Sequence, residues 1–417
     1  MERLADHVDL LTGFPFKSAS YTSDSSGTRL VRGDNVVQGQ LRWENAARWP
    51  DDEQDGIDRY QLEPGDVVLA MDRPWIEAGL KYARIGKDDV PALLVQRVAR
   101  LRAHSDLHQG FLFYLIGSQG FTDHVLAVQT GTAVPHISGK QILEFQFRLP
   151  SYTEQEAIAA LLGSLDDKIE QNRRTARVLE RLARAIFKAW FVDFEPVKAK
   201  AAGAASFPSM PQPTFDALPT TFTTTDHGPV PEGWKMGSLG DVIDIHDARR
   251  VPLSKRQREE RRGVFRYYGA AGVVGHVDGY LFDGCFTLVG EDGTVYGDGD
   301  RPMTQYVWGQ FWVNNHAHVL TGRAPWTTEH IYVLLQHVYI RPFVTGAVQP
   351  KLNQGNLKSV PIVMPPDPVA GSFGDIVEPL FQLLRHVEDE SAKLADMRDL
   401  LLPRLLSGSI RAEVDHG

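Results

Sequence analysis

The sequence predicts a mixed α/β (α+β) protein in which two mixed α/β globules are separated by two long helices. These helices are expected to pair as an antiparallel coiled coil with pseudo-twofold symmetry. A block of sequence near residue 130 recurs near residue 345. A long stretch with helical spacing of apolar residues follows each copy of the block, and short apolar runs bounded by turn residues precede each copy. A duplication of this kind predicts two similar units, each made of a strand-rich globule followed by a helix.

Length and composition are typical of a globular protein with two or three domains. The chain has 417 residues, of which 42% are hydrophobic and 23% charged. Its longest apolar runs are far shorter than the roughly 20 residues that cross a membrane, and its start lacks a signal-peptide pattern. The single cysteine, Cys285, cannot form a disulfide within the chain, which favours a reducing compartment. We therefore expect a cytoplasmic protein without membrane contact.

The first globule is expected over residues 1–150 and the second over residues 234–366. In the first, Asp66–Ala70 and Leu94–Leu101 are short apolar runs next to turn residues, as strands require. Phe286–Gly290 is a similar run in the second globule, within a glycine-dense part of the chain. Both globules should therefore be rich in strands.

The repeat is clearest in two loops that contain a Thr-Gly pair. Residues 130–137 align with residues 345–352 at an offset of 345 − 130 = 215, and the same offset relates Pro150 to Pro365. Thr, Gly and Pro agree in a single register, which favours a duplication over chance matches. We call residues 130–136 the first Thr-Gly loop and residues 345–351 the second Thr-Gly loop.

A long helix is expected after each repeated block, over residues 151–195 and 367–417. Apolar residues recur there in alternating steps of four and three, and one polar residue interrupts each seam 14 positions after its first apolar member (172 − 158 and 390 − 376). This spacing is typical of a coiled coil, and matching polar positions favour helices that pair with each other. The alternative is an amphipathic helix packed on its own globule. The predicted coil or partner interface consists of Leu162, Leu165, Ile169, Asn172, Leu179, Ile186, Trp190, Leu383, Val387, Glu390, Leu394, Met397 and Leu401.

Residues 196–233 are expected to be a linker. They contain the alanines of 199–205, the threonines of 220–225 and six prolines after Pro196. Such a composition does not predict a buried core, so we expect this segment to cross the surface.

Motifs for catalysis and metal binding do not stand out. The sequence lacks a GxxxxGK[ST] loop, a GxSxG elbow, an HExxH helix and a GxGxxG fingerprint between a strand and a helix. Asn314–His318 contains two histidines but no third metal ligand nearby, so a strand with polar alternation is the better interpretation. We expect a non-catalytic chain without its own metal. An enzyme that methylates or cleaves DNA alone would need a cofactor site that these motifs do not reveal.

The net charge of −9 is unevenly distributed along the chain. Residues 367–417 carry 5 basic and 10 acidic groups, a net of −5, whereas residues 234–366 carry 14 and 12, a net of +2. Eight basic residues lie between Arg249 and Arg266, which predicts contacts with DNA phosphates. The alternative is a solvated helix, because Glu259 and Glu260 are interleaved with them.

The candidate DNA-binding residues are basic or polar residues on expected loops and in this arginine-rich segment. Lys and Arg suit phosphates and guanine edges, while Thr, Asn, Gln and His suit base edges but also occur in ordinary polar turns. Loss of Arg249 and Arg250 is expected to flatten the salt dependence of DNA binding. In the first globule the candidates are Lys17, Arg32, Asn35, Arg73, Thr130, His136 and Lys140. In the second globule they are Arg249, Arg250, Lys255, Arg266, Tyr268, Gln349, Lys351 and Asn353.

Several short motifs also occur in an informative order. They are Leu11–Ser18, Pro64–Leu69, Arg148–Pro150 followed by Glu154-Gln155, Phe187–Phe194, Pro231–Trp234, Tyr267–Gly272 and Leu401–Gly408. Through their order and spacing, the chain resembles the DNA specificity (S) subunit of type I restriction–modification systems along nearly its whole length.

The resemblance implies two target-recognition domains, each reading one half of a split, asymmetric DNA site. It also implies that the helices dock two methyltransferase subunits, which carry S-adenosylmethionine and methylate adenine. Two restriction subunits that use ATP and Mg would complete the complex, and this chain itself would bind no cofactor. The resemblance places the protein in the cytoplasm of a bacterium or archaeon. A coiled-coil scaffold whose globules bind a partner other than DNA is the alternative.

Overall fold

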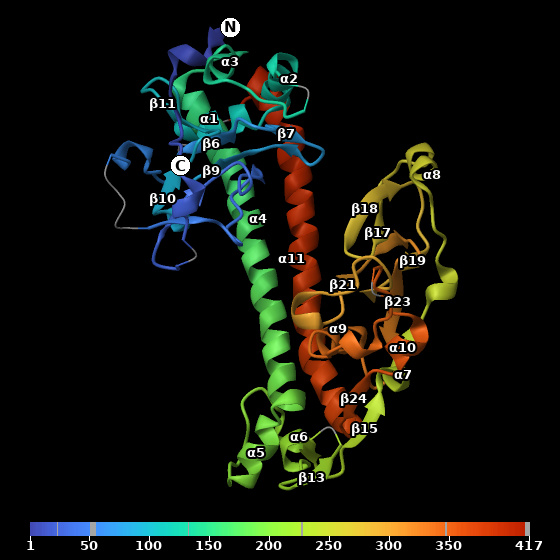
Figure 1. Cartoon of the computed structure of the whole chain (residues 1–417). Helices are drawn as coiled ribbons and strands as arrows, with labels where there is room; N and C mark the ends of the chain where they lie inside the picture. The colour runs from blue at the N-terminus through green and yellow to red at the C-terminus, as the bar shows by residue number, and fades with distance from the viewer. Residues whose placement is uncertain (23, 51–55, 132, 227, 347, 413–417) are drawn as a thin grey trace. The chain divides into compact units, whose positions relative to one another are not determined.

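The chain forms two compact units in the computed structural model, which describes residues 1–22, 24–50, 56–131, 133–226, 228–346 and 348–412 (Figure 1). One unit consists of Met1–Glu170 with Ser391–Gly417, and the other of Gln171–Glu390. Both contain sheets and helices, so the predicted mixed α/β class is confirmed. Among the residues described, no helix has both the length and the apolar character needed to cross a membrane.

The first unit is built around a five-stranded sheet with the strand order β2-β11-β6-β9-β4. All four residues of β6 (Val67–Ala70) are buried, which explains why this run is continuously apolar rather than alternating. A three-stranded sheet has the order β10-β3-β5. The other strands and helices are β1 (Glu2–Arg3), β2 (Val8–Thr12), β3 (Thr28–Val31), β4 (Gln38–Gly39), β5 (Arg48–Trp49), β7 (Trp75–Ile76), β8 (Gly79–Leu80), β9 (Tyr82–Arg84), β10 (Ala92–Leu94), β11 (Val98–Ala103), β12 (Gln146–Phe147), α1 (Gln109–Ile116), α2 (Gln119–Val128) and α3 (Gly139–Leu143).

The second unit contains two four-stranded sheets, with the orders β16-β23-β20-β21 and β18-β17-β22-β19. Its strands are β13 (Phe222–Thr225), β14 (Gly228–Pro231), β15 (Lys235–Ser238), β16 (Ile243–Ile245), β17 (Phe265–Gly269), β18 (Gly272–Val277), β19 (Phe282–Asp283), β20 (Phe286–Gly290), β21 (Thr304–Val307), β22 (Gln310–Val313), β23 (Ala317–Gly322) and β24 (Pro361–Met364). Its short helices are α5 (Glu195–Ala201), α6 (Gln212–Asp216), α7 (Leu239–Val242), α8 (Lys255–Glu260), α9 (Thr328–Leu335) and α10 (Gln354–Lys358).

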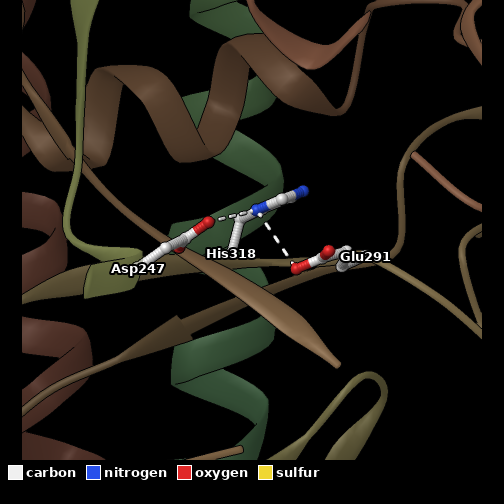
Figure 2. Close-up of side chains that lie close together, drawn as sticks. All are labelled: Asp247, Glu291 and His318. Atoms are coloured by element: carbon white, nitrogen blue, oxygen red, sulfur yellow. Dashed lines mark hydrogen bonds and ion pairs between the residues drawn. The ribbon is translucent and has the colours of Figure 1, made fainter. Parts of the chain in front are cut away.

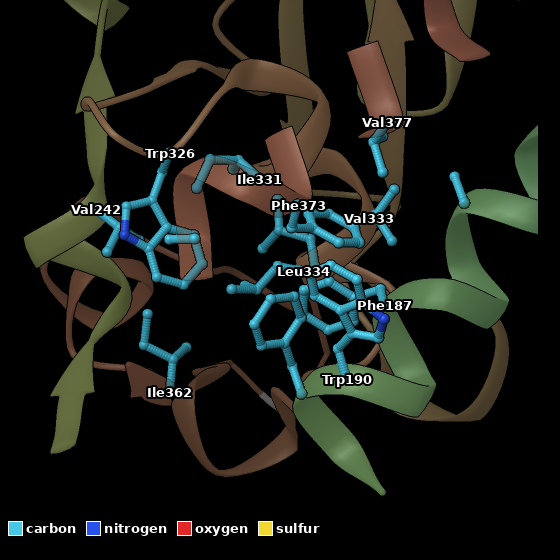
Figure 3. Close-up of a cluster of buried hydrophobic side chains, with 14 of the residues drawn as sticks. Phe187, Trp190, Val242, Trp326, Ile331, Val333, Leu334, Ile362, Phe373 and Val377 are labelled. Carbon is cyan, nitrogen blue, oxygen red and sulfur yellow. The ribbon is translucent and has the colours of Figure 1, made fainter. Parts of the chain in front are cut away.

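Two long helices, α4 (Tyr152–Phe187) and α11 (Asp367–Ser407), contribute residues to both units. The unit boundaries at Glu170 and Ser391 therefore fall inside these helices, whereas the predicted domain boundaries lie at residues 151, 196, 234 and 367. In the second unit, the aromatic rings of Phe187 and Trp190 pack against Phe373 with centroid distances of 5.6 and 5.9 Å (Figure 3).

The predicted repeat is present in the secondary structure. Adding 215 to the bounds of α3 gives those of α10 (139 + 215 = 354 and 143 + 215 = 358), and the starts of α4 and α11 are related in the same way (152 + 215 = 367). Ser138 caps the N-terminus of α3 and Asn353 that of α10. Each Thr-Gly loop is thus followed by the same sequence of a cap, a short helix, a short strand and a long helix.

In the second unit, α4 and α11 run antiparallel, because Asn172 contacts Glu390 while Phe187 contacts Phe373. Asn172 Nδ2 donates to Glu390 Oε2 over 2.7 Å, so the two polar residues that interrupt the predicted seams meet. A polar pair of this kind favours one register of the two helices, since shifting them would separate the partners.

The buried seam differs in part from the predicted one. In the first unit, Arg398 Nη1 on α11 donates to Asp166 Oδ1 on α4 over 2.7 Å. Leu383 and Met397 are 45% and 49% exposed, so they lie outside the buried seam of the coil, and their role in a partner interface stays a prediction. Leu384 is buried instead of Leu383, because two adjacent leucines both match the apolar spacing and only packing selects one. The predicted seam residues that are buried are Leu162, Ile169, Asn172, Leu179, Ile186, Trp190 and Val387, and Leu165, Glu390, Leu394 and Leu401 are half-buried.

The segment 196–233 is not a simple surface linker, which corrects the prediction. Val197, Phe215 and Val230 are buried in the same apolar cluster as Trp190. Lys200 Nζ also donates to the carbonyl oxygens of Asp216 and Leu218, both over 2.6 Å. The average composition of the segment did not predict these buried residues, because a few well-spaced apolar residues are enough to pack a short segment.

Candidate nucleic-acid interface

A buried charged network lies beside the second Thr-Gly loop. Asp247 and Glu291 flank His318, whose Nδ1 lies 2.6 Å from Asp247 Oδ2 and 3.7 Å from Glu291 Oε2 (Figure 2). His318 is fully buried, and it lies on β23. Carboxylate and imidazole groups at these distances resemble a metal-ligand set, so the cations around them decide what the group does.

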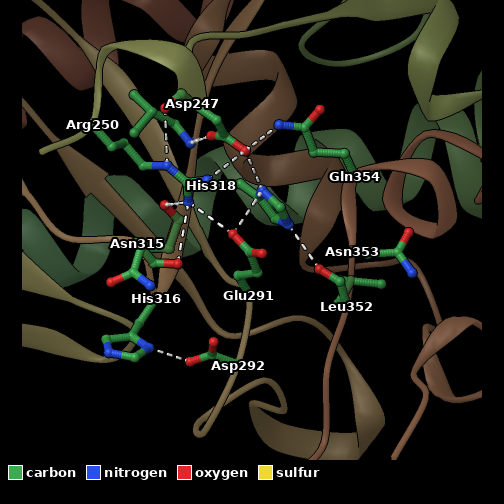
Figure 4. A network of polar contacts seen from close by, with 12 residues as sticks. Asp247, Arg250, Glu291, Asp292, Asn315, His316, His318, Leu352, Asn353 and Gln354 are labelled. Carbon is green, nitrogen blue, oxygen red and sulfur yellow. Dashed lines mark hydrogen bonds and ion pairs between the residues drawn. The ribbon is translucent and has the colours of Figure 1, made fainter. Parts of the chain in front are cut away.

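Protein cations already balance both carboxylates. Arg250 Nη1 donates to Glu291 Oε2 over 2.8 Å, and its Nη2 lies 3.3 Å from Asp247 Oδ2 (Figure 4). Burial by itself raises the pKa of Asp247, but the hydrogen bond and charge of His318, the N–H of Val319 and the charge of Arg250 outweigh it and hold this pKa below its usual value. The arrangement is therefore a self-paired ionic network, in which protein groups balance the charge of both carboxylates.

The network reaches the chain on the C-terminal side of the second Thr-Gly loop through three contacts. Gln354 Nε2 donates to Asp247 Oδ2 over 2.7 Å, and His318 Nε2 donates to the Leu352 carbonyl over 2.7 Å (Figure 4). Lys351 Nζ lies 3.5 Å from Glu291 Oε1. Sequence reasoning missed this network because its members come from four separate segments; the only local signal was a histidine at an apolar position of a strand.

Both Thr-Gly loops have the same backbone pairing. Thr130 and His136 exchange two backbone hydrogen bonds of 2.9 and 2.8 Å, and Thr345 and Lys351 exchange two of 2.9 and 2.7 Å. Thr132 and Ala347, which belong to the two loops, lie outside the described residues. Among the described residues of the two loops, Ala133, Val134, Val348 and Gln349 are exposed.

The glycine in each loop is required by the backbone. Gly131 has a φ of +91° and Gly346 a φ of +86°, a conformation that residues with a Cβ rarely adopt. A Cβ would also lie 2.6 Å from the Val134 carbonyl oxygen in the first loop and 2.3 Å from that of Gln349 in the second. The shared Thr-Gly pair therefore reflects loop geometry rather than contact with a ligand.

In the described part of the first unit, the first loop is attached through backbone hydrogen bonds rather than through a charged network. The N–H of Ile137 donates to the Met71 carbonyl over 2.9 Å, and in the second unit the N–H of Leu352 donates to the Glu291 carbonyl over 2.8 Å. Met71 therefore takes the place of Glu291. Arg73 lies next to this attachment, since its N–H donates to the Pro135 carbonyl over 2.6 Å.

In the first unit, most predicted DNA-binding residues lie on the surface. Asn35 is the exception, because it is buried and its Nδ2 donates to the Leu30 carbonyl over 2.9 Å, which corrects its prediction. Arg32 is half-buried and pairs with Asp34 at 3.5 Å. His136 is also half-buried, and its Nε2 lies 3.0 Å from Thr130 Oγ1. The exposed candidates are Lys17, Arg73, Thr130 and Lys140.

Positive charge and exposed apolar side chains occur together near the first loop. Trp75 and Ile76 on β7 and Val134 in the loop are exposed, and the backbone of Arg73 joins the two segments. Burial lowers the pKa of Lys81, and the nearby charge of Arg73 lowers it further although Asp34 and Asp72 oppose the shift. Basic residues beside exposed apolar groups suit a surface that contacts both phosphates and bases.

In the second unit, the structure divides the arginine-rich segment into two groups. Arg250 is held inside the network and Tyr268 is buried against Phe311, with ring centroids 5.7 Å apart, so neither is available to DNA as predicted. Arg249 Nη2 donates to the Leu281 carbonyl over 2.6 Å. Arg258 and Arg261 likewise lie 5.1 and 4.9 Å from the ring centroids of aromatic residues. The segment's charge was visible in the sequence, but its tertiary partners were not.

The remaining candidates of the second unit lie on loops, on α8 and on β17. Lys255 on α8 and Arg266 on β17 are exposed, as are Gln349 and Lys351 of the second loop. Asn353 is half-buried and accepts a hydrogen bond from the N–H of Asn356 over 2.9 Å, which is the role of a helix cap.

Comparisons with known proteins agree with the duplicated architecture. A family model described as the type I restriction modification DNA specificity domain matches residues 16–181 and 231–394. The MjaIX specificity subunit of Methanocaldococcus jannaschii is 25% identical over 370 residues, which cover 85% of this chain and 79% of that protein. The EcoAI specificity subunit of Escherichia coli is 35% identical over 164 residues, or 39% of this chain and 27% of that protein.

A solved structure shares the fold along almost the whole chain. The crystal structure of the S subunit of a type I restriction-modification system from M. genitalium has a TM-score of 0.56 at 16% identity, and the match covers 97% of this chain and 95% of that one. Because the two matches to the family model together cover more than half of the sequence, this chain belongs to the family of type I restriction–modification DNA specificity subunits.

Proposed function

We propose that this chain reads a bipartite, asymmetric DNA site, with one half assigned to each unit. The observation that supports this most strongly is the pair of Thr-Gly loops, which share a backbone frame but differ in side chains. Val134 and His136 in the first loop correspond to Gln349 and Lys351 in the second (134 + 215 = 349 and 136 + 215 = 351). One frame with different donors and acceptors suits two half-sites of different sequence.

We assign phosphate contacts to the exposed cations of each unit. Lys17 and Arg73 would position DNA on the first unit, and Lys255 and Arg266 on the second, because none of them is buried in its own unit. Side chains of the two Thr-Gly loops would then contact base edges. Phosphate contacts supply most of the affinity, while the loops supply discrimination.

Methyltransferase docking is assigned to exposed apolar residues on the long helices. On α4, Val178 and Leu182 are four residues apart and 52% and 45% exposed, and on α11, Met397 and Leu400 are three apart and 49% and 56% exposed. Residues with this spacing share one face of a helix, and an apolar face on a charged helix suits a partner helix. Two such surfaces fit two methyltransferase subunits.

The catalytic groups of the proposed complex belong to other subunits. The methyltransferases would hold S-adenosylmethionine and modify adenine, and two restriction subunits would use ATP and Mg. The role of this chain is to bring the methyltransferases to one sequence, which requires only that the chain bind that sequence better than others.

A selection experiment with the assembled methyltransferase complex tests this function. The complex is incubated with a pool of random duplex DNA, and the retained molecules are sequenced. We expect two specified blocks separated by an unspecified spacer, and complex lacking this chain serves as the control. If the globules instead bind a partner other than DNA, as in a scaffold, the retained sequences will match the input pool.

A further inference from the structure

We propose that the charged network around His318 positions the second Thr-Gly loop and so determines how strictly the second unit discriminates its half of the DNA site. The proposal rests on the proposed function, because it concerns the same DNA-reading surface. Its members His318, Asp247 and Gln354 are positioning residues: they act through the loop and do not themselves contact bases.

The contacts of the network converge on the end of the loop. Three of the four residues after Pro350 are attached: Lys351 by its ammonium group, Leu352 by its carbonyl and N–H, and Gln354 by its side-chain amide. Each attachment leads to Asp247, Glu291 or His318. A loop that is held at one end by several charged contacts loses much of its freedom before DNA arrives.

Further hydrogen bonds hold the carboxylates of the network on the side away from the loop's attachment points. Asp247 Oδ1 accepts the N–H of Val319 over 2.9 Å, and Arg250 Nη1 donates to the Ala317 carbonyl over 2.8 Å as well as to Glu291. These donors belong to β23 or to the turn that contains Asp247, so the network ties the loop to a buried strand. Because the group is buried and charged, its geometry tolerates little displacement.

Among the residues described in the first unit, no such network holds the Thr-Gly loop, which makes the proposal specific to one half-site. The pairs Val98–Ala70 and Ala317–Gly290 occupy equivalent ends of the central strands. The residue after Val98 is Ala99, which therefore corresponds to His318, as Met71 corresponds to Glu291. The first loop thus depends on backbone hydrogen bonds and apolar packing, and changes to the charged network should not alter what it discriminates.

Two substitutions of different severity test the proposal in the assembled methyltransferase complex. Gln354→Leu removes one hydrogen bond from a solvent-exposed residue, and His318→Asn removes two hydrogen bonds of the imidazole ring at the buried centre. The matched control is Arg385→Met, because Arg385 pairs with Glu329 in the same unit, at 3.1 Å, without contacting the loop. Each complex is given DNA carrying the wild-type target with every position varied, and methylation is measured at each variant site.

We expect both substitutions to relax discrimination in one half of the target only. A wrong base pair that the wild type rejects by about tenfold or more should be methylated within about twofold of the correct one, while the other half and the Arg385→Met complex keep wild-type discrimination. Hydrogen exchange of the paired amides of Thr345 and Lys351 should quicken in Gln354→Leu and not in the control.

Three results would overturn the proposal. These are unchanged discrimination in both variants, an equal fall of discrimination in both halves, and a relaxation in the Arg385→Met control as large as in the two variants. The first result separates the network from DNA reading, and the other two indicate general loss of stability. Failure of the wild-type complex to prefer any sequence would instead refute the proposed function and this inference together.

Discussion

Acid should destabilise the second unit through one buried histidine. His330 on α9 is fully buried, and its ring lies 4.1 Å from the ring centroid of Trp326 and 4.5 Å from that of Phe373. Among the described residues neither of its ring nitrogens has a hydrogen-bond partner. Burial in this aromatic cage lowers the pKa of His330 from 6.5 to about 3, because the charged ring cannot be solvated there.

The sign and size of the effect follow from that shift. The folded unit keeps His330 neutral, while the unfolded chain binds a proton below pH 6.5, so this stability is complete above pH 6.5 and is lost as the pH falls from there toward 3. At pH 5.5 the loss relative to pH 8 is about 1.4 kcal/mol, and at pH 4.5 it is about 2.7 kcal/mol.

The assay is urea unfolding of the full chain at pH 8, 5.5 and 4.5, monitored by tryptophan fluorescence. His330→Leu removes the titrating ring, so the free energy of unfolding should fall less steeply with acid than in the wild type, by the amounts above. Burial and nearby cations also lower the pKa of His337, but that residue is present in both proteins and cancels in the difference. The exposed His276, changed to Leu, is the control. Parallel curves for wild type and His330→Leu would refute the reasoning.

Two further predictions concern salt dependence and the coiled coil. Lys255→Ala and Arg266→Ala should each reduce the slope of log K for DNA binding against log salt concentration by about 1. Arg250→Ala should instead mainly destabilise the second unit, by about 3 kcal/mol, because it leaves buried carboxylates unbalanced. Equal slopes for the wild type and both surface variants would contradict the assignment of phosphate contacts. Asn172→Leu alone should destabilise the second unit by about 1–2 kcal/mol in urea unfolding, while Asn172→Leu with Glu390→Leu should recover most of that loss. A double variant less stable than the single one would show that the polar pair itself stabilises the coil.

Local patterns in the sequence predicted the repeat and the polar positions of the long helices. The offset of 215 between Thr130 and Thr345 carries through to the helix starts, because a loop, a cap and a helix start are all encoded within a few residues. Asn172 and Glu390 were identified by spacing alone, and they form a hydrogen bond.

Tertiary packing decided the points that the sequence left open. Arg250 and Tyr268 have side chains that are common at DNA interfaces, yet one is held by Glu291 and the other is packed on Phe311. The side-chain amide of Asn35 donates its hydrogen bond to a backbone carbonyl five residues earlier in the chain. Residue type and local charge do not distinguish a surface arginine from one that balances a buried carboxylate, because the partner lies 41 residues away in the case of Arg250.

Sequencing the methylated bases of a host that expresses this chain with its methyltransferase tests the central claim most directly. Two readers with different loops predict methylated adenines in a single motif that has two specified blocks, a fixed unspecified spacer and no palindromic symmetry. The motif should disappear when this chain alone is deleted. A continuous or palindromic motif, or methylation that persists without the chain, would contradict the account.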